Sequence, residues 1–314
     1  MTTSAEAAPL IVSRLAKSYG AGRGVQDVSL KVRAGSVTGF IGANGAGKST
    51  TLRCVVGLAQ PDRGSIELFG QPVSFELRRR IGFLPEERGL APRERARDAI
   101  AFHARLKGLG RAEAYCRADA LLERIGLAGR TQTRIEELSK GNAQRVQILC
   151  AIAHDPELLI LDEPFSGLDP IAQAEVQSLF SEYRSKGGAI LFSTHSMASA
   201  ERLCDEVVIL AEGRTVFSGP LDEAAECAGH GAYLTTDDAA ALQAVVKEIG
   251  AQAEPFQSQF GEALRWKVIL PAGAPHVLLL RALAEHQVSI HGFEPIKADL
   301  EGAFWSLASK RAAA

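Results

Sequence analysis

A glycine-rich segment that follows a short apolar run constrains the fold of this chain most strongly. Residues 42–50 read Gly-Ala-Asn-Gly-Ala-Gly-Lys-Ser-Thr, and they lie between the apolar residues 37–41 and a helix-compatible stretch. Glycines let successive backbone N–H groups turn toward one anion, and a helix start adds a favourable dipole. The pattern therefore predicts a phosphate-binding loop between a buried strand and a helix.

Two side chains of this loop have expected roles. Lys48 would reach the outer phosphates of a nucleotide, and the Ser49 hydroxyl would bind Mg²⁺. A plain glycine-rich turn is the alternative, and the bare pattern arises by chance in about one chain per hundred of this length. The strand before it and the helix after it argue against chance.

A pair of acids follows a second apolar run. Residues 158–161 are Leu-Leu-Ile-Leu, and Asp162 and Glu163 come directly after them. Asp162 suits the holding of Mg²⁺, directly or through one of its ligands, and Glu163 could orient and deprotonate a water molecule. Adjacent acids at a strand end are often only solvated, but the phosphate loop favours the functional interpretation.

Three further apolar runs suit buried parallel strands of an α/β sheet. They cover residues 81–84, 189–192 and 207–210. Four of the five runs are followed by groups with chemical potential, namely the glycine loop, Glu86, the acidic pair and His195. Ligands of open α/β sheets bind beyond the carboxyl ends of the strands, so these groups are expected to share one crevice.

The remaining segments predict a second sheet region and an inserted helical subdomain. Val28, Leu30 and Val32 alternate with polar residues, which predicts an antiparallel piece of sheet. Helix formers dominate residues 93–106 and 112–125, within a subdomain expected at about residues 86–155.

The pattern changes after Gly219 and Pro220. It predicts a small α+β domain at residues 229–314, after a larger domain at residues 1–228. The elements expected in the small domain are a strand from about Ala232, a helix at 239–249, two strands including 264–270, a helix at 277–286, a strand, and a helix from Leu300.

Composition excludes several classes of protein. The chain has 314 residues and a formal charge of -2, so it lacks the clustered basic excess that nucleic acid binding needs. No apolar run exceeds six residues and residues 1–10 do not resemble a secretory signal, so the chain is not expected to cross a membrane alone. The five cysteines form no CxxC pair and are expected to be reduced thiols of a cytoplasmic protein.

Taken together, the motifs resemble the ABC ATPase family over about residues 8–220. Residues 138–142, Leu-Ser-Lys-Gly-Asn, look like the family's LSGGQ motif, and residues 166–169 look like its D-loop. His195 matches the switch histidine, and Tyr19 stands where the family places an aromatic ring against adenine. Alone, a histidine or tyrosine is more often a core residue, and Leu-Ser-Lys-Gly can be a helix N-cap. Six elements in family order favour the resemblance.

The resemblance implies a P-loop NTPase cassette with a mixed sheet and an inserted helical subdomain, and a head-to-tail pairing of two cassettes. ATP would lie between the phosphate loop of one cassette and Ser139, Gly141 and Asn142 of the other. Asp169 would communicate across the dimer, and Glu163 and His195 would be catalytic. The implied nucleotide contacts in the loop are Gly42, Asn44, Gly45, Gly47, Lys48, Ser49 and Thr50, and the implied Mg²⁺ ligands are Ser49, Glu86 and Asp162.

The implied role is an ATP-hydrolysing subunit that powers separate membrane-spanning permease subunits from the cytoplasmic face of the inner membrane. Glu86 replaces the family's glutamine, and Lys140 and Asn142 also depart from the commonest motif. Glu86 would contact Mg²⁺, or alternatively face solvent, the permease or Arg88. The segments PEERGL, LSKGN and residues 297–304 resemble bacterial exporters that include sodium-extrusion and drug-resistance ATPases, whose cassettes carry an extra C-terminal domain.

Two alternatives compete with a transport ATPase. A soluble ABC ATPase that acts on ribosomes or DNA is disfavoured, because the chain has one cassette and lacks a long coiled coil or zinc cysteines. A regulatory cassette without turnover is disfavoured because Lys48, Asp162, Glu163 and His195 are all present. The cargo would be selected by the permease.

Overall fold

The computed structural model describes residues 8–20, 23–87, 89–256, 265–271, 274–296 and 299–312. Of the segments used above, residues 1–7, Arg88, Leu264, Lys297 and Ala298 lie outside the described residues. The chain divides into two compact units after Pro220. None of the helices in the described ranges has both the length and the apolar character that crossing a bilayer requires. All five cysteines are free thiols.

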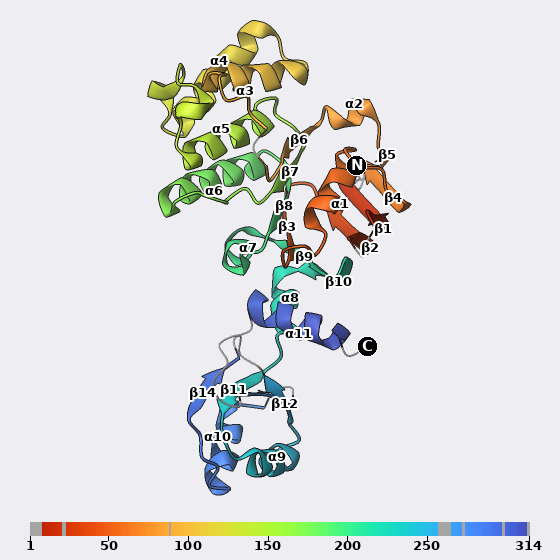
Figure 1. Cartoon of the computed structure of the whole chain (residues 1–314), viewed down its shortest axis with the longest axis vertical. Coiled ribbons are helices and arrows are strands. Elements are labelled where there is room, and N and C mark those ends of the chain that lie inside the picture. Colours follow the sequence, from red (N-terminus) through yellow and green to blue (C-terminus); the bar gives the residue numbers. More distant parts are fainter. Residues whose placement is uncertain are drawn as a thin grey trace, which may run out of the picture. The chain divides into compact units, whose positions relative to one another are not determined.

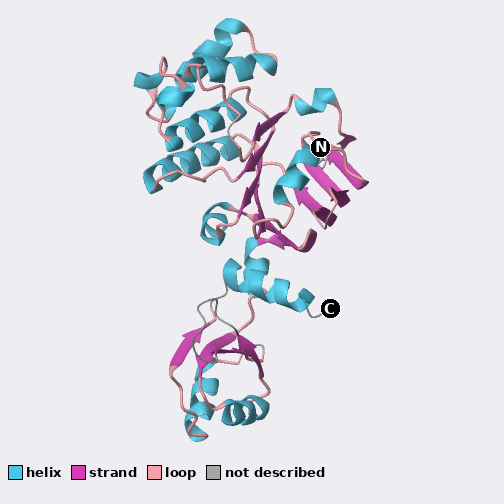
Figure 2. Ribbon diagram, in the orientation of Figure 1, coloured by secondary structure: helices cyan, strands magenta, loops and turns pink. Residues whose placement is uncertain are grey.

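A mixed sheet of ten strands forms the centre of the N-terminal unit (Figures 1 and 2), in the order β5-β4-β1-β2-β10-β9-β3-β8-β7-β6. Its strands are β1 (Leu10–Ser18), β2 (Gly24–Val32), β3 (Val37–Gly42), β4 (Arg63–Leu68), β5 (Gln71–Pro72), β6 (Ile81–Leu84), β7 (Leu158–Asp162), β8 (Ala189–Thr194), β9 (Glu206–Ala211) and β10 (Arg214–Pro220). The five predicted apolar runs are β3, β6, β7, β8 and β9, which pair in parallel. The predicted antiparallel piece is β2, which pairs with β1.

Helices cover both faces of the parallel strands. They are α1 (Lys48–Val55), α6 (Pro170–Ser185) and α7 (Met197–Leu203), and the short α2 (Phe75–Arg78) lies before β6. Phe40 of β3 packs in one core with Leu52 of α1, whereas a Cβ at Gly39 would meet Cys204 at the end of α7. Neighbouring strand residues point to opposite faces, so β3 is buried on both. Burial on both faces explains why these strands are continuous apolar runs.

The predicted helical subdomain is inserted between β6 and β7. It contains α3 (Ala96–Leu106), α4 (Arg111–Arg124), the 3₁₀ turns η1 (Ala128–Arg130) and η2 (Ile135–Glu137), and α5 (Lys140–Ile152). The predicted helices at 93–106 and 112–125 are α3 and α4, and α3 packs on both α4 and α5. Figure 2 shows this group of helices beside the end of the sheet that carries β6.

The C-terminal unit is an antiparallel sheet with helices, in the strand order β12-β13-β11-β14. Its elements are α8 (Leu221–Glu226), β11 (Gly231–Thr235), α9 (Ala239–Glu248), β12 (Gln252–Phe256), β13 (Arg265–Ile269), α10 (His276–Glu285), β14 (Gly292–Pro295) and α11 (Leu300–Ala312). Ala232, Leu234, Trp266 and Val268 share a core with α9 and α10. The predicted order of strands and helices is confirmed, whereas α8 was not predicted. Because α8 packs on α11, the unit begins before the boundary expected after residue 228.

Candidate functional site

A hollow of about 480 Å³ lies beyond the carboxyl ends of β3, β6 and β7. Its walls come from the glycine loop, the first turns of α1, and the segments that follow β6 and β7. The lining residues are Tyr19, Arg23, Gly24, Asn44, Gly45, Gly47, Lys48, Ser49, Thr50, Arg53, Glu86, Asp162 and Glu163. The structure thus brings the loop, Glu86 and the acidic pair into one hollow.

The backbone of the loop requires glycine at its tightest point. Gly47 has φ of 106°, and a Cβ there would lie 2.3 Å from the Cγ1 atom of Val25. Gly45 has φ of 82°, but a Cβ there would meet no atom within 4 Å. Both positions are left-handed, but only Gly47 is also closed off by a neighbour.

This contrast gives a stability prediction. Gly45→Ala should cost about 1–2 kcal/mol of unfolding free energy, the penalty for a left-handed residue with a Cβ. Gly47→Ala carries the same penalty and must also displace Val25, so it should cost clearly more. Denaturant unfolding of the two variants measures the difference. Equal losses would contradict the packing of Val25 against the loop.

Lys48 is held with its ammonium group inside the loop. The residue is 7% exposed, and its Nζ atom donates hydrogen bonds to Gly42 O at 2.7 Å and Ala43 O at 3.2 Å. An ammonium group has three donors, so one remains for a third acceptor. Burial lowers the pKa of Lys48, and the nearby carboxylates, Glu163 first among them, oppose that shift. The loop therefore holds a cation directed at the phosphate position.

Glu163 and His195 form a pair at the edge of the hollow. His195 Nδ1 donates to Glu163 Oε1 at 2.8 Å. The backbone of Glu163 has φ of 49°, a left-handed conformation that residues other than glycine rarely adopt. Its backbone N–H donates a hydrogen bond to Ser193 Oγ at 3.1 Å. The His195 side chain is 61% exposed, so it is not the core histidine of the plain alternative.

Asp162 lies deeper, at the end of β7. The residue is 4% exposed, and Ser193 Oγ donates a hydrogen bond to its Oδ1 atom. The Ser193 hydroxyl therefore contacts both acids, Asp162 at its side-chain carboxylate and Glu163 at its backbone N–H. The hydrogen bond from Ser193 restricts the carboxylate of Asp162, which is one of the residues that line the hollow.

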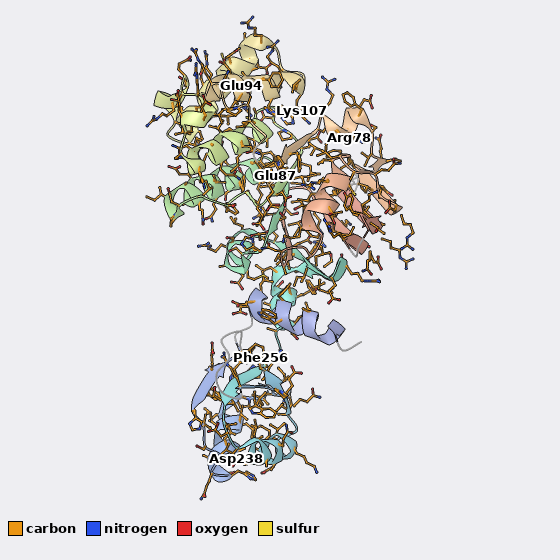
Figure 3. The ribbon with its side chains drawn as sticks, in the orientation of Figure 1. Arg78, Glu87, Glu94, Lys107, Asp238 and Phe256 are labelled. Carbon is orange, nitrogen blue, oxygen red and sulfur yellow. The ribbon has the colours of Figure 1, made fainter. Side chains whose placement is uncertain are left out.

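Glu86 lines the hollow next to Ser49. Ser49 Oγ donates to Glu86 Oε2 at 3.4 Å. The loop around Glu86 is tied to α5, because Gln147 Nε2 donates to Pro85 O at 3.4 Å and to Glu87 O at 3.3 Å. Figure 3 labels Glu87, which follows Glu86 in the segment after β6. The expected alternative partner, Arg88, lies outside the described residues.

Six predicted residues do not line the hollow. Two of them, Gly42 and His195, contact residues that do, and the other four lie at the starts of two helices. Ser139 is the N-cap of α5 and accepts the Asn142 N–H at 3.2 Å, and Asp169 is the N-cap of α6 and accepts the Ala172 N–H at 2.9 Å. Gly141 lies close to the D-loop, since a Cβ there would sit 3.4 Å from Gly167 O. The plain N-cap explanation is thus correct for Ser139. It does not conflict with a nucleotide contact, because the hydroxyl proton stays available.

The remaining predicted contacts and some additional ones complete the site. Gly42 contributes its carbonyl to Lys48, and Tyr19 is 54% exposed at the hollow's rim, so it is not a core residue. Sequence patterns missed Arg23 and Arg53, which line the hollow, and Gln147. The sequence did contain a signal for Ser193, because this residue directly precedes Thr194 and the predicted catalytic residue His195.

The oxygen donors fit Mg²⁺ bound together with a phosphate. Ser49, Glu86 and Asp162 all offer hard oxygen atoms to the same hollow. The described residues contain no group of three or more His, Cys, Asp or Glu side chains able to hold a metal ion. Proteins commonly hold Mg²⁺ through one or two carboxylates plus substrate phosphates, so this donor set fits a metal that arrives with a nucleotide.

A strand, a glycine loop with a buried lysine, and a helix, with an acidic pair on the neighbouring part of the sheet, define a P-loop nucleotide-binding protein. Residues 25–166 match the family model described as "ABC transporter". The chain belongs to the ABC transporter family, as an ATP-binding subunit. Subunits of this family work with membrane permease components.

Three comparisons illustrate this membership. The chain is 42% identical over 214 residues to the uncharacterized ABC transporter ATP-binding protein YhaQ of Bacillus subtilis. The matched region covers 68% of this chain and 72% of YhaQ. It is 36% identical over 215 residues to the Nod factor export ATP-binding protein I of Burkholderia orbicola, covering 68% and 71%. The solved structure of cbiO1 from Clostridium perfringens, part of the ABC transporter complex cbiONQ, matches with a TM-score of 0.61 and 29% identity over 69% of this chain and 90% of that one.

Proposed function

We propose that this chain hydrolyses ATP and thereby powers a membrane exporter whose spanning segments belong to other chains. The observation that carries the proposal is the Glu163–His195 pair at the edge of the hollow that holds Lys48. In this proposal, Glu163 is the proton acceptor and His195 is its polar partner, beside the expected position of the outer phosphate. Relatives such as the Nod factor export protein support the exporter direction.

The chemistry follows from the positions of three side chains. The loop N–H groups and the third donor of Lys48 hold the phosphates of ATP. One oxygen of Glu163 accepts from His195, so the other is available to accept a proton from water. As the water oxygen bonds to the γ-phosphorus, the bond between the γ-phosphorus and the bridging oxygen breaks and ADP leaves. Mg²⁺ held by Ser49, Glu86 and Asp162 would neutralise charge on the phosphates.

The helix starts outside the hollow support a paired arrangement. Ser139 and Asp169 are both solvent-exposed, and each caps the positive end of a helix of more than ten residues. Helix starts attract phosphate groups. We infer that Ser139, Gly141 and Asn142 contact the ATP of a second copy, and that ATP itself holds the two cassettes together.

Glu86 is the residue with the most specific magnesium prediction. A carboxylate near the triphosphate strengthens metal binding and repels metal-free nucleotide, because repulsion is poorly screened where the effective dielectric is low. Glu86→Gln should therefore need more magnesium for half-maximal ATP hydrolysis and should bind metal-free ATP more tightly. A magnesium titration of both variants tests this. An unchanged magnesium dependence would place Glu86 toward solvent or the permease.

The C-terminal unit is proposed to regulate the cassette or to support its dimer. The described part of it contains no phosphate loop, and the adjacent acids that follow β11 have other partners, because Asp238 is the N-cap of α9 and Asp237 contacts His291. A chain that ends at Pro220, where the two units divide, should fold, bind ATP and hydrolyse it at high protein concentration. Phosphate release by the shortened chain measures this. ATP binding without hydrolysis at high concentration would show that the unit takes part in catalysis.

One experiment distinguishes a transporter subunit from the alternative, a soluble ABC ATPase that acts on ribosomes or DNA. The tagged chain is recovered from detergent-solubilised membranes of its host and its companions are identified. A transporter subunit should return with a chain that has about six apolar segments, each of about twenty residues. Recovery with ribosomes or DNA in place of such a chain would overturn the transport assignment.

A further inference from the structure

The C-terminal unit contains a hollow of its own, of about 360 Å³, between its sheet and the start of α11. We call it the aromatic hollow, because the rings of Tyr233, Phe256 and Trp305 line it. The other polar lining groups are Arg265, Glu294, Asp299 and Glu301. Neither the family resemblance nor the ATP chemistry gives this hollow a role.

The lining follows from strand and helix periodicity. Ala232 and Leu234 point into the core with α9 and α10, so Tyr233 between them faces the other side of the sheet. Across the sheet, Tyr233 pairs with Glu294 of β14, which therefore shares its face. On α11, Glu301 and Trp305 are four residues apart and share one helix face. A strand face and a helix face thus converge on this space.

An internal cation already occupies part of the hollow. The guanidinium carbon of Arg265 lies 4.7 Å from the ring centroid of Tyr233 and 5.9 Å from that of Phe256. Arg265 is also ion-paired with Glu294. Cations within about 6 Å of an aromatic face are attracted by the ring. The aromatic rings of the hollow therefore already bind one positive group, the Arg265 guanidinium, at cation–π distances.

The charge of the lining favours a second cation over an anion. Three carboxylates, Glu294, Asp299 and Glu301, face one guanidinium among the described lining residues. Burial raises the pKa of the Tyr233 hydroxyl, and these carboxylates raise it further while Arg265 opposes them. Burial, the largest of these causes, therefore keeps the Tyr233 hydroxyl protonated and the ring neutral. Trp305 is 42% exposed, which leaves a large ring accessible to a ligand.

We propose that the aromatic hollow is a binding site for a small organic cation with an aromatic or quaternary ammonium group. Trp305 and Tyr233 contact the positive group, and Glu301 supplies counter-charge. Arg265 competes for the same rings and sets the affinity. The proposal concerns the C-terminal unit and stands independently of the ATP chemistry.

The test uses the full chain and benzyltrimethylammonium as the probe, with binding followed by titration calorimetry. The probe should bind saturably, whereas benzenesulfonate, which carries the opposite charge on the same ring, should not. Trp305→Ala should weaken binding by roughly 3- to 30-fold, the range for a lost cation–π contact. Arg265→Gln should tighten it, because the internal competitor is removed. Leu280→Ala is the matched control, since Leu280 of α10 is also 42% exposed and does not line the hollow.

Several outcomes would overturn the proposal. They are equal binding of benzenesulfonate, unchanged affinity in both Trp305→Ala and Arg265→Gln, or no saturable binding in wild type and Arg265→Gln. If Trp305→Ala does not fold, Glu301→Gln at an exposed position provides the same test, and an unchanged affinity there contradicts the site. Figure 3 labels Phe256 in this unit, at the end of β12.

Discussion

Replacing Glu163 with glutamine should slow ATP hydrolysis by roughly 10²- to 10⁴-fold, the range for a lost general base. ATP binding should be retained, because the phosphates are held by the loop and Lys48. The amide can still accept the hydrogen bond from His195, so the site's geometry should survive. Without hydrolysis, the ATP-bound dimer should accumulate. Single-turnover phosphate release and size-exclusion chromatography measure the two effects.

Glu212 provides a matched control for this substitution. Its backbone has φ of 49°, the same value as Glu163, but it lies between β9 and β10 and does not line the hollow. Glu212→Gln should therefore hydrolyse ATP at the wild-type rate. Near-wild-type turnover in Glu163→Gln would place the catalytic base elsewhere.

The second large effect is expected for Lys48. Lys48→Met keeps the length of the side chain and an apolar stem in a buried position but removes the charge. Truncating one partner of a buried charged hydrogen bond costs about 2–5 kcal/mol, so ATP affinity should fall by roughly 30-fold to more than 10³-fold. Equilibrium binding of ATP measures the loss.

The control for Lys48 is Lys31→Met. Lys31 is an exposed lysine of β2 outside the hollow, so its substitution should leave ATP affinity unchanged. Thermal unfolding of Lys48→Met should stay close to wild type, which separates lost binding from lost fold. ATP affinity within threefold of wild type in Lys48→Met would contradict the assigned phosphate contact.

The sequence predicted the central strands well for a physical reason. Strands β3, β7, β8 and β9 are buried along their whole length, so their residues are nearly all apolar and stand out from the surrounding helices. The groups that follow them converge because parallel strands end at one edge. The short α8 was missed because Leu-Asp-Glu-Ala-Ala-Glu has no extended apolar face.

Other features depend on packing that the sequence does not display. Gln147 lies in a helix whose residues are mostly buried, and no local pattern distinguishes a glutamine that holds loop carbonyls from one that does not. Arg53 lies on α1, which begins at Lys48, and it lines the same hollow as the first residues of that helix. The two interpretations of Ser139 coincide, since a helix N-cap and an anion contact use the same end of a helix.

The central claim is that this chain hydrolyses ATP as a pair of cassettes. The most direct measurement is the rate of phosphate release per molecule of the purified full chain, with ATP and magnesium saturating, over a range of protein concentrations. We predict that this rate rises with concentration, reaches a plateau as dimers form, and is lost in Glu163→Gln. Phosphate release that stays at the level of Glu163→Gln at every concentration would contradict the account.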